Sequence, residues 1–362
     1  MLKNILKVPL NYLGRYINLP LALPMSIAFA VTYRCNSHCR TCNIWRDSLD
    51  ANELNLPEID CLFRSLGRSF AWITLSGGEP FLRSDLADIC QIIYRNCRPS
   101  VISIPTNGSL PGTIIDCVKK ILKDCSKIEL IINLSIDGIG EEHDNIRGLL
   151  GNFDKAITTY KVLKNLKNQR LRIGLYTIVS NYNINSLENI LYFSKQLLPD
   201  THFFEDAQIR DEFKNQELSH IIPSKADYIT FLQKLYNTKD NKKQDLLERV
   251  IHYLRRNYYS FVEKTLIFKR QIIPCFAAFA SAYILPDGKV WACSSRKWLM
   301  GDLREYDFDF NKLWWSKNSQ EIRRINKKEK CSCLQVNTNY MNLIHNPLYL
   351  AKLIYNFLFR VK

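Results

Sequence analysis

Short apolar runs alternate with stretches of helical spacing between residue 26 and about residue 210. The apolar runs are rich in β-branched and aromatic residues and predict six strands, at 26–33, 71–76, 101–106, 130–137, 171–179 and 202–209. Apolar residues recur at helical spacing between them and predict five helices, at 57–68, 84–96, 112–124, 153–166 and 185–197. Because this alternation is typical of a parallel sheet and a closed barrel needs eight units, we expect an α/β fold with a partial (β/α)6 barrel and a sixth helix beyond the last strand.

The pattern changes after residue 210. Two longer helical stretches are predicted at roughly 224–239 and 244–268, joined by an exposed polar linker over 237–245. A smaller unit begins near residue 274, where 281–295 predicts a hairpin with its turn at Pro286-Asp287-Gly288. The sequence therefore predicts five parts: a basic apolar N-terminal segment (1–24), the barrel core (25–210), a helical connector (211–270), a small cysteine-bearing domain (271–335) and a basic apolar C-terminal helix (336–362).

Positive charge is concentrated at both ends of the chain. The formal net charge of +15 favours anionic partners, residues 1–34 contain no acid, and the last twenty residues carry two lysines and one arginine without an acid. These ends suit peripheral contact with an anionic membrane at its inner, cytoplasmic face, although packing against the barrel explains them equally well. The stretch 19–31 resembles a signal peptide, but its prolines and its length favour a strand, and we expect no transmembrane helix.

The twelve cysteines are too few for a secreted disulfide scaffold in a chain of 362 residues, so we expect a cytoplasmic protein with free thiols. Five of them occur singly in helix-like stretches and are ordinary buried thiols: Cys61, Cys90, Cys97, Cys117 and Cys125. The other seven fall into two groups, a front group of Cys35, Cys39 and Cys42 and a rear group of Cys275, Cys293, Cys331 and Cys333. Two groups predict two sites.

The front group lies in "YRCNSHCRTCNIW", residues 33–45, which we call the cysteine loop. Its C-x3-C-x2-C spacing directly follows the first predicted strand, and chance would produce it about 0.01 times in a chain of this cysteine content. A zinc site with His38 as the fourth ligand and a set of unrelated buried thiols are the alternatives. Three thiolates in a short loop suit a [4Fe–4S] cluster with one iron left open for a ligand.

Polar or glycine-rich motifs end the next three predicted strands. Gly77-Gly78-Glu79-Pro80 ends the second, "PTNGS" the third and "LSIDG" the fourth. Two glycines at a strand end let another molecule approach the backbone and leave its N–H and C=O groups free to bond it. Each motif alone is a plausible turn, but the carboxyl ends of parallel strands share one edge of the sheet. Three in succession therefore indicate a ligand site beside the cysteine loop.

The combination of "CNSHCRTC", "SGGEP", "TNG", "SIDG" and "IRG" over about residues 25 to 210 resembles the radical S-adenosylmethionine (radical SAM) enzyme superfamily. The resemblance implies that a [4Fe–4S] cluster is held by Cys35, Cys39 and Cys42 while S-adenosylmethionine chelates the fourth iron. It also implies ligand contacts from Gly77, Gly78, Glu79 and Pro80 to the amino group, from Asn107 near the ribose, and from Ser135 and Arg147 to the carboxylate.

The planar guanidinium of Arg147 suits a carboxylate, and its alternative is a surface ion pair with Glu141, Glu142 or Asp144. The chain departs from the family at Thr41, where many members carry an aromatic residue. Packing of the adenine then falls to Ile44 or Trp45.

The rear group resembles the SPASM and twitch auxiliary-cluster domains of the same superfamily. Between Cys275 and Cys293 stands Gly288, and a tryptophan-bearing helical stretch precedes Cys331 and Cys333. A full SPASM tail has four cysteines where this chain has two, but four rear cysteines suffice for one auxiliary [4Fe–4S] cluster. A zinc site built from the same thiolates is the alternative.

The implied reaction is reductive cleavage of S-adenosylmethionine to a 5′-deoxyadenosyl radical that abstracts hydrogen from a substrate, with electrons from a flavodoxin or ferredoxin-type donor. The basic apolar ends favour a lipid, isoprenoid or lipid-linked sugar. A peptide ranks second as the substrate, because the first cysteine at residue 35 leaves no room for a peptide-recognition domain before it. Substrate contacts are expected from Tyr176, Glu205 and Asp206. A non-catalytic iron–sulfur or zinc protein that binds RNA is the alternative, but the chain has no aromatic-basic recognition motif and we expect no nucleic acid.

Overall fold

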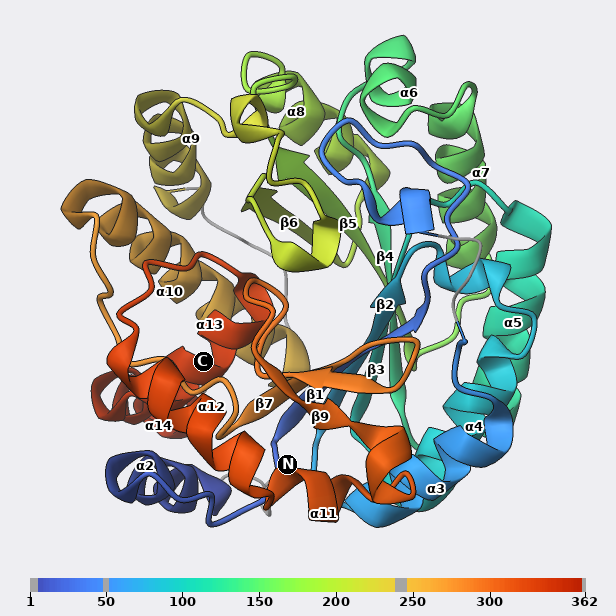
Figure 1. Ribbon diagram of the computed structural model, residues 1–362. Helices are drawn as coiled ribbons and strands as arrows, with labels where there is room; N and C mark the ends of the chain where they lie inside the picture. The colour runs from blue at the N-terminus through green and yellow to red at the C-terminus, as the bar shows by residue number, and fades with distance from the viewer. Residues whose placement is uncertain (1–5, 48–51, 238–245, 360–362) are drawn as a thin grey trace.

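The barrel core is the main feature of the computed structural model, which describes residues 6–47, 52–237 and 246–359 (Figure 1). Its six parallel strands are β1 (Ser26–Thr32), β2 (Trp72–Gly77), β3 (Val101–Thr106), β4 (Glu129–Ser135), β5 (Leu171–Val179) and β6 (Thr201–Asp206). They pair in chain order, from β1 to β2 and onward to β6. The predicted partial barrel is confirmed, and each predicted motif lies at or just beyond the carboxyl end of its strand.

Helices cover the outer face of this sheet (Figure 1). The five predicted ones are α3 (Leu56–Leu66), α4 (Leu86–Cys97), α5 (Pro111–Asp124), α7 (Asn152–Lys164) and α8 (Leu187–Leu197). Between β4 and α7 lies an additional short helix, α6 (Glu141–Arg147), which is too short to show a periodic pattern in the sequence. The sixth helix does not follow β6 directly, since two single-turn 3-10 helices, Asp211–Phe213 and Ser219–Ile221, come first.

The connector consists of α9 (Lys225–Asn237) and α10 (Leu246–Phe268). The predicted linker over 237–245 lies outside the described residues except for Asn237. α10 packs on α13 (Val336–His345). Both helices reach the edge strand β6 through Phe203, whose ring contacts Tyr258 and Tyr259 of α10 and Tyr340 of α13. These two helices therefore cover the open side of the barrel.

The small domain continues the barrel sheet. The predicted hairpin is confirmed as β7 (Ser281–Ile284) and β8 (Lys289–Trp291), and a further strand, β9 (Leu299–Asp302), pairs with β8. β7 pairs in parallel with β1, so the described sheet has nine strands in the order β6-β5-β4-β3-β2-β1-β7-β8-β9. Two helices follow β9, α11 (Phe310–Trp314) and α12 (Lys317–Lys328).

The first and last described helices lie next to each other (Figure 1). The N-terminal segment contains α2 (Lys7–Ile17), which packs on α13, and Asn11 Nδ2 lies 3.2 Å from His345 Nε2. The predicted single C-terminal helix is wrong: α13 ends before Asn346, and α14 (Pro347–Phe359) begins at the proline. A residue that precedes proline disfavours the helical conformation, which accounts for the break.

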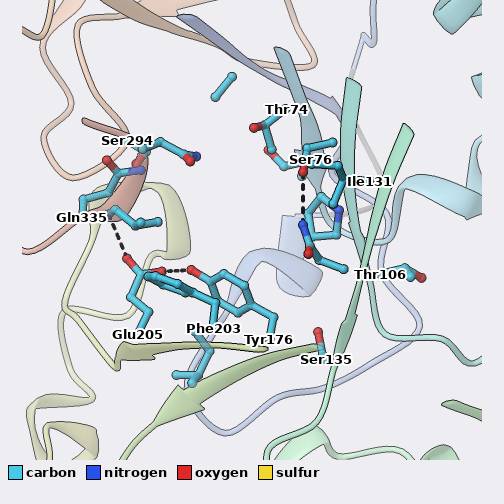
Figure 2. A pocket seen from close by; sticks show the side chains of 18 of the residues that line it. Thr74, Ser76, Thr106, Ile131, Ser135, Tyr176, Phe203, Glu205, Ser294 and Gln335 are labelled. Atoms are coloured by element: carbon cyan, nitrogen blue, oxygen red, sulfur yellow. Dashed lines mark hydrogen bonds between the residues drawn. The ribbon is translucent and has the colours of Figure 1, made fainter. Parts of the chain in front are cut away.

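The inside of the barrel is hollow. Closed barrels fill this space with layers of bulky branched side chains. Here the inward positions carry small polar residues that line a cavity of about 300 Å³, which we call the lumen: Thr74, Ser76, Ser103, Asn133 and Ser135. Figure 2 shows Thr74, Ser76 and Ser135 among the side chains that line it. Position 174 requires glycine, because a Cβ there would collide with the side chains of Asn133 and Thr201. The lumen reaches the carboxyl ends of the strands, where the motifs lie.

Candidate active site

The Gly-Gly turn after β2 holds the start of the cysteine loop. The N–H of Gly78 donates to the carbonyl of Thr32 and the N–H of Glu79 to that of Arg34, both at 2.8 Å. A Cβ at Gly77 or Gly78 would collide with these same carbonyl oxygens. The prediction that this turn leaves its N–H groups free for another molecule is therefore wrong for Gly78 and Glu79, because these N–H groups bond the chain's own backbone. Both glycines still line the lumen.

Glu79 joins the ends of β2 and β3. Its buried carboxylate accepts hydrogen bonds from Phe81 N at 3.2 Å, Thr106 Oγ1 at 2.8 Å and Asn107 N at 2.7 Å. Burial raises the pKa of Glu79, while these three donors act in the opposite direction. The chain's own donors thus occupy much of this carboxylate, which positions the turn at the mouth of the lumen.

Asn107 ties the end of β3 to the cysteine loop. Its Nδ2 donates to Asn36 Oδ1 at 2.8 Å and to Ser37 Oγ at 2.9 Å, and its Oδ1 accepts from Ser109 N at 2.9 Å. Asn107 lines the lumen. Its contact with a ribose stays a prediction, and the structure adds the role of fixing the loop that carries the cysteines.

Arg147 points into the molecule and not toward solvent. Its Nη1 donates to Asp137 Oδ2 at 3.1 Å, and Asp137 Oδ1 accepts from Ile178 N at 2.7 Å. The alternative of a surface ion pair with the acidic residues of α6 is wrong. Arg147 and Ser135 both line the lumen, and among the described residues the buried Nε of Arg147 has no partner. A free donor on a fixed guanidinium fits a carboxylate ligand. The sequence analysis missed Asp137, although it lies within the "LSIDG" motif.

The three front cysteines are half-buried and lie close enough to influence one another. Burial raises the pKa of Cys35 to about 12 and also raises the pKa values of Cys39 and Cys42. Neighbouring thiols raise the pKa values of Cys35 and Cys42 further, whereas Arg147 acts in the opposite direction on Cys35 and Cys39. Without a positive partner these thiols therefore stay protonated, so an ionised set requires a bound cation or cluster.

The surroundings of the front group favour a cluster over zinc. The ring of His38, the candidate fourth zinc ligand, packs on Trp45 with 4.4 Å between centroids. Trp45 Nε1 donates to the carbonyl of Cys42 at 3.0 Å, and neither Trp45 nor Ile44 is among the side chains that line the lumen.

The four rear cysteines lie close together in the fold, although more than forty residues of sequence separate Cys275 from Cys331 and Cys333. Burial raises the pKa of Cys275 to about 11, with Cys333 and Cys331 contributing, and raises that of Cys293, with Cys333 and Cys275 contributing. Gln335 N donates to Cys333 Sγ at 3.3 Å. None of the twelve cysteines is in a disulfide. The rear group therefore offers four free thiols to one auxiliary cluster.

A polar network lies on the lumen wall between the two cysteine groups. The Tyr176 hydroxyl and the Arg210 guanidinium both donate to the buried Glu205 carboxylate, which also accepts from Val336 N at 3.2 Å. Figure 2 shows Tyr176 and Glu205 pointing toward each other. The network joins β5 and β6 to the start of α13, directly after the rear cysteines. Arg210 follows the last strand without any motif, so no signal in the sequence could have found it.

Of the three predicted substrate contacts, Tyr176 and Glu205 line the lumen and Asp206 does not. Burial, followed by the neighbouring Glu205 carboxylate, raises the pKa of Asp206 to about 7. Asp206 is thus a buried carboxyl group behind the wall of the site.

The hollow barrel and its two cysteine groups define an iron–sulfur enzyme of the radical SAM class. The profile of the Radical SAM superfamily matches residues 29–193, and that of the SPASM iron–sulfur cluster-binding domain matches residues 275–334. The barrel core thus contains a radical SAM domain, and the small domain is a SPASM domain. Its cofactors are accordingly a [4Fe–4S] cluster and S-adenosylmethionine, with an auxiliary iron–sulfur site in the SPASM domain. The RNA-binding, non-catalytic alternative is set aside.

Relatives in this superfamily catalyse several reactions. The chain is 26% identical over 322 residues to AdoMet-dependent heme synthase of Methanosarcina barkeri, covering 85% of this chain and 86% of the relative. It is 30% identical over 167 residues to Fe-coproporphyrin III synthase of the same organism, covering 45% of this chain and 39% of the relative. The structure of native anSMEcpe with bound AdoMet has the same fold, with a TM-score of 0.59 at 18% identity, covering 91% of this chain and 98% of that one.

No helix in the described parts of the chain is both long enough and apolar enough to cross a membrane.

Proposed function

We propose that the chain cleaves S-adenosylmethionine reductively at the front group and uses the resulting 5′-deoxyadenosyl radical to remove hydrogen from a substrate in the lumen. The observation that carries this proposal is the position of Arg147 Nε, which has no partner among the described residues, beside the three half-buried front cysteines at the mouth of a hollow barrel. The [4Fe–4S] cluster, held by Cys35, Cys39 and Cys42, supplies the electron for the cleavage and an iron for the methionyl group.

The chain's own residues orient the ligand. The Arg147 fork, fixed by Asp137, meets the methionyl carboxylate, and Ser135 lies on the same part of the wall. The Gly77-Gly78 turn offers carbonyl oxygens to the amino group, since the N–H groups of Gly78 and Glu79 are engaged by the carbonyls of Thr32 and Arg34. The lumen encloses the substrate and keeps bulk water away from a reactive carbon radical. The four rear thiols would hold the auxiliary cluster.

The test is anaerobic reconstitution of the full chain with iron and sulfide, followed by addition of dithionite and S-adenosylmethionine. We expect release of 5′-deoxyadenosine, and deuterium should enter its 5′ carbon when the lipid fraction of cells grown in heavy water is added. Deuterium from the peptide fraction alone would move the substrate to peptides. No 5′-deoxyadenosine under any condition would refute the function.

The surface at the chain ends supports a substrate drawn from a membrane. α2 and α14 expose several large apolar side chains to solvent: Leu10, Leu13, Tyr16, Ile17, Leu348, Ile354 and Tyr355. Some basic residues at the chain ends pack against the rest of the protein, and others remain available for contact with a membrane. Lys7 and Arg15 donate to the carbonyls of Ser69 and Cys275 at 2.5 and 2.8 Å and so pack inward, whereas Lys352 is exposed. An apolar face with an exposed lysine and no acid on either helix complements an anionic bilayer.

Replacing both Leu13 and Tyr16 with glutamate should lower binding of the reconstituted chain to phosphatidylglycerol vesicles at low salt by at least about tenfold. Each change removes apolar area that the bilayer would bury and adds a negative charge that the anionic lipid repels. Leu150→Glu is the control, since Leu150 is 89% exposed and lies between α6 and α7. Vesicle co-sedimentation measures the difference. If the unchanged chain stays in the supernatant, or if the double variant sediments with the vesicles equally well, the membrane proposal is wrong.

A further inference from the structure

Arg255, on α10, lines the lumen without a carboxylate partner. Four arginines line the lumen, and three of them form ion pairs: Arg147 with Asp137, Arg172 with Glu129 and Glu248, and Arg210 with Glu205. Within the part of the chain that the structure describes, Arg255 forms no such pair, and its buried Nε has no hydrogen-bond partner. The positive charge of Arg255 is therefore uncompensated by the chain.

The surroundings of Arg255 hold its guanidinium at the lumen wall. The guanidinium carbon lies 5.9 Å from the ring centroid of Phe203, a cation–π contact, and Arg255 interacts with the Tyr340 hydroxyl. Ile251, one turn earlier on α10, and Asn337, on α13, line the same side. This part of the wall thus combines a fixed planar cation with a hydroxyl and an amide, all of which can donate hydrogen bonds.

The position of Arg255 along the sheet separates it from the predicted S-adenosylmethionine contacts. Phe203, on which Arg255 packs, pairs with Tyr176, and Tyr176 pairs with Ser135, so Phe203 lies level with Ser135 but two strands away, roughly 10 Å at 4.8 Å per strand. The residues predicted to address the methionyl group lie at or beyond the carboxyl ends of β2 to β4, and β5 separates β4 from β6. A group bound at Arg255 therefore leaves the rest of a substrate to extend toward those strand ends.

We propose that Arg255, with Tyr340 and Asn337, binds an oxyanion of the substrate, either a carboxylate or a phosphate. A partly buried cation without a counter-charge is unfavourable by itself, and a bound oxyanion compensates it while using the free Nε. The oxyanion anchors one end of the substrate, so that a carbon some distance from it faces the radical. The inference rests on the proposed function and adds to it the chemical class of the substrate.

Calorimetric titration of the full, reconstituted chain tests the subsite without turnover. The protein is first saturated with S-adenosylmethionine, without reductant, so that Arg147 is occupied. Inorganic pyrophosphate and glutarate are then titrated separately at constant ionic strength. The variants are Arg255→Gln, Arg255→Lys and, as a matched control, Arg256→Gln, because Arg256 is the next residue on α10, is exposed and is not among the residues lining the lumen.

We expect saturable binding in the unchanged chain and in the Arg256→Gln variant, a loss of at least about tenfold in affinity for Arg255→Gln, and an intermediate loss for Arg255→Lys, which keeps the charge but not the planar fork. Binding of pyrophosphate alone assigns a phosphate, and binding of glutarate alone assigns a carboxylate. The proposal is overturned if neither anion binds the unchanged chain or if Arg255→Gln binds as the control does. Since no reductant is present, this result is independent of whether S-adenosylmethionine is cleaved.

Discussion

Replacing Cys39 with alanine is expected to reduce release of 5′-deoxyadenosine by more than about 100-fold, a larger loss than is typical when a residue around a metal ligand is changed. The same variant should bind about four iron atoms per chain in place of about eight. The physical reason is that the front group has only three thiolates, so that loss of one leaves the cluster with two protein ligands. Iron and acid-labile sulfide assays, with chromatography of the nucleoside, measure both effects on anaerobically reconstituted protein.

Cys61→Ala is the matched control for this prediction. Cys61 is an exposed thiol on α3, outside both cysteine groups, so its loss should leave iron content and nucleoside release unchanged. A Cys39→Ala protein that retains about eight irons and full release would show that the front group is not the site of the cluster.

Replacing Glu79 with alanine should lower the free energy of unfolding by about 3 kcal/mol, because the three donors that its carboxylate accepts from lose their partner inside a buried site. The variant should also bind S-adenosylmethionine more weakly, since the turn and the end of β3 lose their link. Denaturant unfolding followed by circular dichroism, and equilibrium binding, measure these two effects.

The control is Glu188→Ala on α8. The Glu188 side chain is 69% exposed and pairs with Lys234 at the surface, so its removal should change stability by less than about 1 kcal/mol. If Glu79→Ala were as stable as Glu188→Ala and bound S-adenosylmethionine normally, the carboxylate would have no positioning role.

The sequence was sufficient to predict the barrel core, because each strand and each outer helix carries its own local pattern. Residues 71–76 and 101–106, for example, are short apolar runs that end in a glycine or polar motif, and the structure has strands at Trp72–Gly77 and Val101–Thr106. The parallel pairing of β7 with β1 could not be predicted in this way. It joins segments some 255 residues apart, Ser26 with Ser281, and depends on packing across the whole chain.

The site was predicted in part for a similar reason. Motifs singled out Gly77 and Asn107 at the strand ends and Arg147 beyond the fourth strand, but not their local partners. The need for glycine at position 77 comes from the Thr32 carbonyl, and Arg147 turns inward because Asp137 receives it. Single residues such as Arg255 belong to no motif. Their significance comes only from what lies opposite them in the folded chain.

The measurement that tests the central claim most directly is electron paramagnetic resonance of the reduced front cluster. A Cys275→Ala/Cys293→Ala variant leaves two rear thiols, so that the front group is the remaining three-thiol set. We predict a reduced [4Fe–4S] signal that changes when S-adenosylmethionine is added and broadens further when its carboxylate carries ¹⁷O, because the open iron binds that group. A signal that S-adenosylmethionine leaves unchanged, or zinc in place of iron in the front group, would contradict the account.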